Sequence, residues 1–325
     1  MPIEHARLSA RFPEIPAGRG HYESFYLKAC HPSEPLGLWI RYTVHKQPGA
    51  LPTGSVWFTR FSADGPIAVK VTVPDVSVAP GMAVVIGAHG HMGDGFLAGD
   101  VPGASWDLRF DGSEEPLRHL PREWMYKAPI PRTKLTSPYP DITVSGRVVA
   151  AGEEFVLDGW RGMIGHNWGA EHAERWIWLH GTDFATDPSA WFDVAIGRIR
   201  VGGITLPWVA NGVLCLDGVR HRLGGLERIA ATQIRELPDG CAAVLPGKGV
   251  KVWVRVSAPE ERFAEWVYED PSGGEHHVLN CSIAAMELQV EGASPVKLST
   301  TYGAAYELGT RPATGGHPEG GLARG

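Results

Sequence analysis

The chain has 325 residues, of which 43% are hydrophobic and 20% charged, a composition typical of a soluble globular protein with two modest domains or one large one. Its net charge of -6 at pH 7 excludes the positive surface that binding to nucleic acid or an acidic membrane requires. The 41 glycines and 26 prolines favour many turns between short elements over long helices.

The termini and cysteines indicate the compartment. The first residues, MPIEHARLSARFPEIPAG, lack the basic stretch followed by an apolar core that marks a secretory signal. No apolar run approaches the ~20 residues that span a bilayer. Cys30, Cys215, Cys241 and Cys281 are far apart in the sequence, so we expect buried free thiols. A cytoplasmic protein with no nucleic-acid partner and no integral membrane segment is predicted, and its oligomeric state stays open.

Strand patterns follow one another along the chain. Apolar and polar residues alternate in residues 36–44, and four valines alternate with Lys, Trp and Arg in residues 250–256. Residues 117–125 and 260–266 could each form at most a short helix. Similar strand patterns occupy residues 55–61, 67–73, 82–86, 142–149 and 278–290.

Many short strands separated by turns predict an all-β protein of the barrel or sandwich type. The proline-rich segment from Pro129 to Pro140 is the best linker candidate. It divides the chain into an N-terminal barrel, residues 1–138, and a C-terminal barrel, residues 139–310. The tail, residues 311–325, has almost no hydrophobic content and is expected to be disordered.

The segment from Arg161 to Gly197 is the strongest candidate for chemistry. It predicts three short strands, on each of which alternate side chains share a face. If the strands are neighbours, one surface collects four tryptophans, two histidines and a carboxylate. The shared-face residues are His166 and Trp168 on the first strand, Trp176, Trp178 and His180 on the second, and Trp191 and Asp193 on the third.

Three sequence stretches carry a family resemblance: HYESFYLKACHP, SWDLRF and GMIGHNWGAEHAERWIWLHG. They resemble the lipocalin-like superfamily that includes carotenoid hydratases (hydroxyneurosporene synthases), tocopherol cyclases and certain fungal and bacterial pericyclases. The resemblance extends from about Tyr22 to Glu307 and implies two lipocalin-like antiparallel β-barrels in tandem. In carotenoid hydratases the proposed site has an H-x-W and a Y-x-D element. His166-Asn167-Trp168 matches the first, whereas Trp191-Phe192-Asp193 has Trp in place of Tyr.

These residues suggest acid chemistry on a hydrophobic, unsaturated substrate. Asp193, with its pKa raised by apolar surroundings, would protonate a C=C bond. The tryptophans would stabilise the carbocation, each by up to ~2 kcal/mol. His166 would act as base or position water, with His180 as the second candidate. The predicted function is therefore a cofactor-independent hydratase, cyclase or isomerase acting on an isoprenoid or polyene.

Structural roles for the same residues remain alternatives. Tryptophans on strands commonly pack in cores, and Asp193 could form an ion pair with Arg175, Arg198 or Arg200. His166 could cap a turn or bond a backbone carbonyl. A carrier of hydrophobic ligands, or a pericyclase that uses cavity shape alone, is then the alternative function.

Other polar residues are weaker candidates. His89, His91 and Asp94 have the side-chain types of a metal site, but they lie in a glycine-rich stretch without a clear fourth ligand. We therefore expect a flexible loop there, and neither metal nor cofactor is predicted. Glu23, Glu287 and Glu307 could line a cavity or form structural ion pairs.

Overall fold

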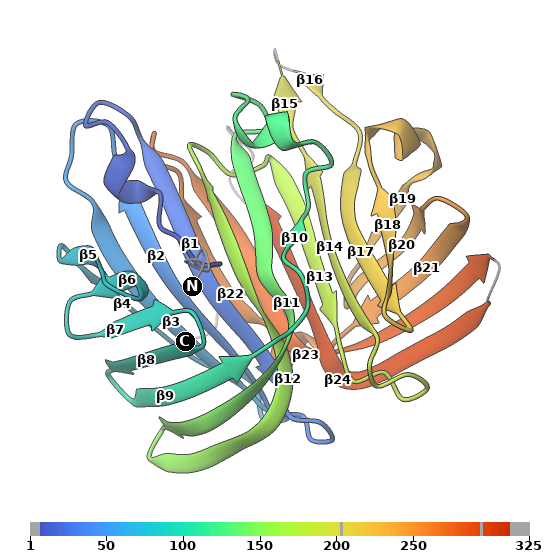
Figure 1. The fold of residues 1–325 in the computed structure, drawn as a ribbon, viewed down its shortest axis with the longest axis horizontal. Coiled ribbons are helices and arrows are strands. Elements are labelled where there is room, and N and C mark those ends of the chain that lie inside the picture. The colour runs from blue at the N-terminus through green and yellow to red at the C-terminus, as the bar shows by residue number, and fades with distance from the viewer. Residues whose placement is uncertain (1–6, 202–203, 293–294, 313–325) are drawn as a thin grey trace, which may run out of the picture.

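The computed structural model describes residues 7–201, 204–292 and 295–312, and it contains two large antiparallel sheets that lie side by side (Figure 1). The prediction of an all-β protein with antiparallel sheets is confirmed, and one of the two sheets is nearly closed as a barrel. Four 3-10 helices connect the strands: η1 (Phe12–Glu14), η2 (Glu123–Tyr126), η3 (Leu226–Ala231) and η4 (Glu260–Arg262).

The first sheet has twelve strands in the order β4-β3-β2-β1-β12-β11-β9-β8-β7-β6-β5, with β10 paired to β11. It curls so that β2 and β3 face β7 and β6 across an apolar core. The strands are β1 (His21–Cys30), β2 (Gly37–Lys46), β3 (Thr53–Phe61), β4 (Ile67–Val73), β5 (Val76–Ala79), β6 (Met82–Ile86), β7 (Gly90–Gly93), β8 (Phe96–Val101), β9 (Ala104–Asp111), β10 (Leu117–Arg118), β11 (Thr133–Ala150) and β12 (Glu153–Gly169).

The second sheet has ten strands in the order β18-β17-β14-β13-β24-β23-β21-β20-β19, with β22 paired to β23. A separate pair, β15 (Arg200–Val201) and β16 (Ile204–Thr205), projects from it. The other strands are β13 (Arg175–Gly181), β14 (Trp191–Arg198), β17 (Val209–Leu216), β18 (Val219–Gly224), β19 (Gln233–Leu237), β20 (Gly240–Pro246), β21 (Val250–Ser257), β22 (Ala264–Glu269), β23 (Glu275–Gly292) and β24 (Val296–Thr310).

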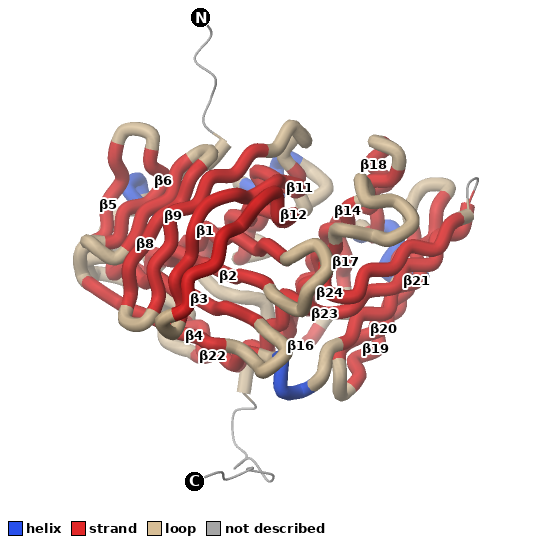
Figure 2. The backbone as a smooth tube through the Cα atoms, turned by 90° about the horizontal axis from the view of Figure 1, so that it is seen from below, coloured by secondary structure: helices blue, strands red, loops and turns tan. Residues whose placement is uncertain are grey.

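Strand β1 explains how the sheets are joined. All ten of its residues are buried, although a strand of an antiparallel sheet commonly has one face in the core and the other in water. One face, with Phe25 and Leu27, belongs to the first core, while Tyr26 belongs to the second. Lys28 Nζ donates to the Gly303 carbonyl at 2.7 Å, which fastens β1 to the second sheet. Strands β23 and β24 of the second sheet lie close to β1, and Figure 2 shows the two sheets next to each other.

From Thr133 onward the proline-rich segment forms the start of strand β11 and is not a free linker. Pro138 and Pro140 lie within β11, at shifts of its register against β12, where a missing backbone N–H leaves no ladder bond unmade. Residue 139, the predicted start of the second barrel, therefore lies inside a strand of the first sheet. The chain passes to the second sheet between β12 and β13.

Several other sequence predictions can be compared with the structure. The strands predicted at residues 67–73 and 82–86 coincide with β4 and β6. The predicted helical segment 260–266 contains η4, whereas the segment 117–125 begins with β10 and only overlaps η2. All four cysteines are buried and free, as expected. Within the described ranges, no helix has the length and apolarity needed to cross a membrane. The predicted disordered tail lies outside the described residues, apart from positions 311 and 312.

Candidate functional site

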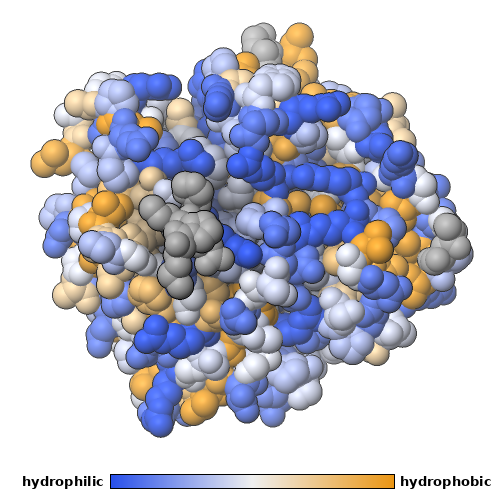
Figure 3. Space-filling model, in the orientation of Figure 1, coloured by the Kyte–Doolittle hydropathy of each residue, from blue (hydrophilic) through white to orange (hydrophobic). Residues whose placement is uncertain are grey.

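A cavity of about 990 Å³ lies between the two sheets, within the size range of small-molecule pockets. Strands β1 and β2 form one wall and β13 and β14 the other, while residues 119–133 cover one side. Trp124 and Ile130 on that segment are 63% and 48% exposed, which places them at the mouth. On the face that Figure 3 shows, hydrophobic side chains are scattered among hydrophilic ones. The aromatic side chains that line the cavity are Tyr22, Tyr26, Trp39, Trp124, Trp176, Trp178 and Tyr268.

Two glycines let aromatic rings lie flat against the neighbouring strands. Trp176 pairs with Gly309 across β13 and β24, and a Cβ atom at Gly309 would lie 2.1 Å from the indole. Tyr26 pairs with Gly165 across β1 and β12, where a Cβ atom would lie 2.0 Å from the phenol ring. Because real Cβ atoms do not approach so closely, only glycine allows these two rings to form the cavity wall.

His172 is held at the cavity wall by Asp270. Its Nδ1 and backbone N–H both donate to Asp270 Oδ1, at 2.7 and 2.8 Å. His276 Nε2 and Arg311 Nη2 donate to the other carboxylate oxygen, at 3.0 and 2.9 Å. Burial opposes ionisation of Asp270, but the hydrogen bonds from His172 and His276 outweigh it and lower its pKa. Asp270 is therefore a fixed negative charge that orients the His172 ring.

The His172 ring is neutral and has one nitrogen without a partner. Burial lowers the pKa of His172 to about 4, although Asp270 opposes this shift. Since Nδ1 carries the hydrogen donated to Asp270, Nε2 carries the lone pair. Among the described residues nothing bonds to Nε2. The ring stacks on Tyr22 at 4.0 Å and packs against Trp176 at 5.5 Å. This is the arrangement of a general base in an aromatic pocket.

The same cluster contains the residues that could hold a metal. Ligand atoms of His172, Asp270 and His276 lie within 4.8 Å of one another. Their present hydrogen bonds, together with the Arg311 guanidinium on Asp270, already satisfy the carboxylate. A cation there would have to displace a positive charge, so these residues fit a hydrogen-bonded cluster better than a metal centre.

Two of the three candidate metal ligands in residues 89–94, His89 and Asp94, are hydrogen-bonded to other groups of the protein. Asp94 Oδ1 accepts from the Leu8 backbone at 3.0 Å and from the Tyr139 hydroxyl at 3.1 Å. His89 Nδ1 contacts the Asp100 carbonyl at 3.1 Å. The expected flexible loop is wrong, because His91 lies in β7, which pairs with β6 and β8, while His89 and Asp94 lie in the turns before and after that strand.

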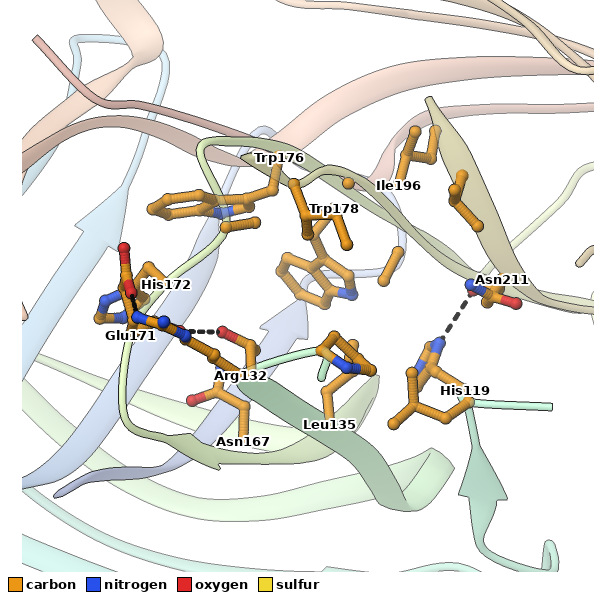
Figure 4. A pocket seen from close by; sticks show the side chains of 18 of the residues that line it. His119, Arg132, Leu135, Asn167, Glu171, His172, Trp176, Trp178, Ile196 and Asn211 are labelled. Atoms are coloured by element: carbon orange, nitrogen blue, oxygen red, sulfur yellow. Dashed lines mark hydrogen bonds and ion pairs between the residues drawn. The ribbon is translucent and has the colours of Figure 1, made fainter. Parts of the chain in front are cut away.

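The second and third predicted strands come together as expected. Strands β13 and β14 pair directly, with His180 opposite Asp193. Trp178 Nε1 donates to Asp193 Oδ1 at 3.1 Å. Trp176 and Trp178 line the cavity, and Figure 4 shows them across the hollow from Asn167 and Arg132. The His180 Nε2 faces the Pro140 carbonyl at 3.2 Å, and burial lowers its pKa to about 3.

The expected raised pKa of Asp193 is wrong. Burial does favour the neutral acid, but His119 and Ser137 outweigh it and hold the pKa below its usual value. Ser137 Oγ donates to Oδ2 at 2.5 Å, and His119 Nε2 lies 3.4 Å from the same oxygen. Asp193 lies behind Trp178 and His119, which themselves line the cavity. It is thus an ionised carboxylate that holds two cavity residues in place.

The first predicted strand is not a neighbour of the other two. It is part of β12, which pairs with β1 and β11 in the first sheet, so the three-strand surface is wrong. His166 and Trp168 point into the first barrel, where His166 Nε2 lies 2.8 Å from Glu23 Oε1. Trp168 packs under the Arg11 guanidinium at 3.9 Å. The intervening Asn167 lines the cavity, because alternate side chains of β12 face opposite ways.

Trp191 also lies away from the cavity. It is buried in a small cluster with Leu117, Val213 and Cys215, with the Arg220 guanidinium 5.1 Å from its ring. Of the tryptophans predicted to bind substrate, Trp176 and Trp178 are therefore the two that line the cavity.

Several cavity residues escaped the sequence prediction. His172, Arg41, His119 and Tyr268 come from four segments that only the tertiary structure brings together. Glu307, proposed to line a cavity or form an ion pair, does line it. Its Oε1 accepts from Trp176 at 2.9 Å, and its Oε2 accepts from Tyr268 and Asn280, each at 3.1 Å.

The Trp178–Asp193 bond has a measurable contribution to stability. Trp178→Phe keeps an aromatic ring but leaves one oxygen of a buried carboxylate without its donor. We expect the free energy of unfolding, measured by urea denaturation, to fall by ~1–3 kcal/mol. Trp253→Phe is the matched control, because Trp253 is 42% exposed and its bond to Glu291 is at the surface. Equal effects of the two substitutions would contradict the buried bond's contribution.

Comparisons with known proteins identify the fold. No family model matches the chain. An uncharacterized protein of Mycobacterium tuberculosis is 24% identical over 333 residues, covering 95% of this chain and 92% of the relative. The solved structure of CghA aligns with a TM-score of 0.63 at 12% identity over 92% of this chain and 90% of CghA. Kievitone hydratase from Nectria haematococca aligns at 0.55 and 10% identity, over 91% and 89%. The chain therefore has the lipocalin-like fold of these two proteins.

Proposed function

We propose that this protein is a cofactor-independent hydratase, cyclase or isomerase that moves a proton on a hydrophobic, unsaturated small molecule in the cavity between the sheets. The observation that carries the proposal is His172, a neutral histidine that lines an aromatic-walled cavity and whose Nε2 bonds to nothing among the described residues. The hydratase with the same fold and the resemblance to carotenoid hydratases and tocopherol cyclases support this class of reaction.

His172 would act first as a base and then as an acid. Its Nε2 takes a proton from a substrate carbon or from an attacking water, and Asp270 balances the charge of the resulting imidazolium. Because the pKa of His172 is about 4, the imidazolium holds this proton only transiently and would return it to a second carbon of the substrate. One proton leaves the substrate or water and one is returned, so no cofactor is required for the balance.

Two further groups would assist the transfer. Tyr26 lines the cavity, and burial raises the pKa of its phenol well above 10, so the hydroxyl stays protonated and can donate to a substrate oxygen. The faces of Trp176 and Trp178 would pack against the apolar, unsaturated part of the substrate and hold it in place. An isoprenoid or polyene fits these apolar walls.

A carrier without chemistry is the second candidate. Asp193, the acid expected from sequence, is ionised and fully hydrogen-bonded behind the cavity wall, which favours a binding role over protonation by a carboxylic acid. A barrel-type fold with an apolar cavity suffices to carry a hydrophobic ligand.

Deuterium transfer separates the two. The ligand that co-purifies with the protein from its own host would be extracted, identified by mass spectrometry and returned to ligand-free protein in D₂O. A proton-transfer enzyme gives a product or ligand one or two mass units heavier, with a further gain of one water for a hydratase. A carrier, or a pericyclase that works by shape, leaves no deuterium on carbon, and that result would refute the proposal.

A further inference from the structure

Arg41 on β2 is a buried cation without a carboxylate partner. The residue is 4% exposed and lines the cavity. Its Nε donates to Ser24 Oγ at 2.6 Å, whereas Nη1 is buried and bonds to nothing among the described residues. Within the described ranges no carboxylate oxygen lies within 4.0 Å of its guanidinium. A buried charge in this state is costly unless something else pairs with it.

Two other cations nearby, Arg311 and Lys28, form ion pairs or hydrogen bonds with groups of the protein. Arg311 pairs with Glu171 and Asp270, at 2.8 and 2.9 Å. Lys28 donates to the carbonyl of Gly303 at 2.7 Å. Arg41 therefore departs from the pattern of its own surroundings.

The guanidinium lies between the apolar cavity and a smaller polar hollow. Its carbon is 3.9 Å from the centre of the Tyr268 ring, and Trp57 lies at 5.5 Å. The second hollow, of about 130 Å³, shares Tyr22, Arg41, His172 and Tyr268 with the main cavity. Its other lining residues include Thr43, Ser55, Thr72 and Lys70. A polar end group at Arg41 would thus have hydroxyl and cationic neighbours on one side and aromatic walls on the other.

The carboxylates nearest to this region do not neutralise Arg41. Both Glu307 oxygens are occupied by Trp176, Tyr268 and Asn280. Glu269 lines the small hollow but makes no ion pair with Arg41, and Glu23 is bonded to His166 and to the backbone of Arg11 and Phe12. Lys70, whose Nζ lies 3.9 Å from the Trp57 ring centre, adds a second positive charge.

We propose that Arg41 binds the carboxylate of the substrate, so that the ligand of this cavity is a hydrophobic carboxylic acid. A planar guanidinium with free N–H groups matches a carboxylate and forms charge-assisted hydrogen bonds with it. His172 and Arg41 both pack on Tyr268. The carbons close to the carboxylate would therefore lie beside His172 Nε2. This inference rests on the proposed function only for the cavity, since a carrier would bind the same acid.

The test compares an acid with its uncharged ester. Ligand-free full-length protein is titrated at pH 8 with cis-parinaric acid, a fluorescent polyene acid, and with its methyl ester. We expect the acid to bind at least ~10-fold more tightly than the ester, and Arg41→Gln to remove ~10–100-fold of the acid's affinity while leaving that of the ester within ~3-fold. Arg147→Gln is the matched control, because Arg147 lines neither hollow, is 71% exposed and pairs with Glu154.

Three results would contradict the binding of a substrate carboxylate by Arg41. Equal binding of acid and ester by the wild-type protein, binding of neither probe, or an acid preference that survives in Arg41→Gln would overturn the assignment. If Arg41→Gln does not fold by circular dichroism, Arg41→Lys keeps the charge without the planar fork, and its acid preference is expected to fall ~3–10-fold. An acid preference without deuterium transfer would leave this inference standing and refute the proposed enzyme alone.

Discussion

Replacing His172 with asparagine is expected to slow deuterium transfer to the ligand by ~10²–10⁴-fold, the usual contribution of a positioned general acid or base. The asparagine side-chain N–H can take the place of Nδ1 and keep the bond to Asp270, which in the wild-type protein measures 2.7 Å. What the variant lacks is Nε2, the atom that would receive the proton. The rate is measured with the co-purified ligand in D₂O, and ligand affinity is measured separately by fluorescence.

The control for His172→Asn is a histidine outside the cavity. His277→Asn removes an exposed histidine next to His276 on the solvent side of β23, so its rate should stay within ~2-fold of wild type. Asp270→Asn tests a positioning role. It should lower the rate and also shift the acidic limb of the pH–rate profile to lower pH, because without the negative charge of Asp270 the pKa of His172 falls further. A rate in His172→Asn equal to that of wild type would show that Nε2 takes no part in the reaction.

The sequence predicted local structure well because local structure depends on local pattern. Alternating residues in the strands that became β4, β6 and β21 specify which face is apolar, whatever the strand pairs with. The pairing of β13 with β14 was also accessible, since a short connection favours antiparallel neighbours. This is why Trp178, His180 and Asp193 share a region in the structure as they did in the prediction.

Long-range pairing explains the part of the site that was missed. Strand β12 follows β11 and precedes β13 in sequence, but it pairs with β1, more than one hundred residues away, and this turns His166 into the first barrel. No pattern within residues 161–169 predicts that this segment pairs with β1. Similarly, the sequence shows Arg41 only as one polar residue in an alternating strand. That it lines a cavity follows only from the tertiary structure, in which Tyr268 of β22 and Glu307 of β24 lie on the same cavity wall.

Acid is expected to destabilise the protein well before its carboxylates are protonated. Burial lowers the pKa of His172 to about 4 and that of His180 to about 3, and it also lowers the pKa of His166. In the unfolded chain each takes up a proton near pH 6.5. Between that pH and the folded pKa the unfolded state binds more protons, so stability falls as the pH falls. His172 and His180 each contribute about 1.4 kcal/mol per pH unit in that window, or about 3 kcal/mol per pH unit together.

Urea denaturation at pH 7.5, 6 and 5 measures this slope directly. The steepest loss is expected between pH 6 and 5, where the histidines of the unfolded chain are charged and His172 and His180 of the folded protein are still neutral. His180→Asn removes one titrating group whose Nδ1 has no partner among the described residues, so its slope should be shallower by about 1.4 kcal/mol per pH unit. Stability that stays constant from pH 7.5 to 5 would mean that these histidines ionise in the folded protein as they do in water. In that case His172 would be a charged residue at mildly acidic pH, and its assignment as a neutral base would fail with the stability prediction.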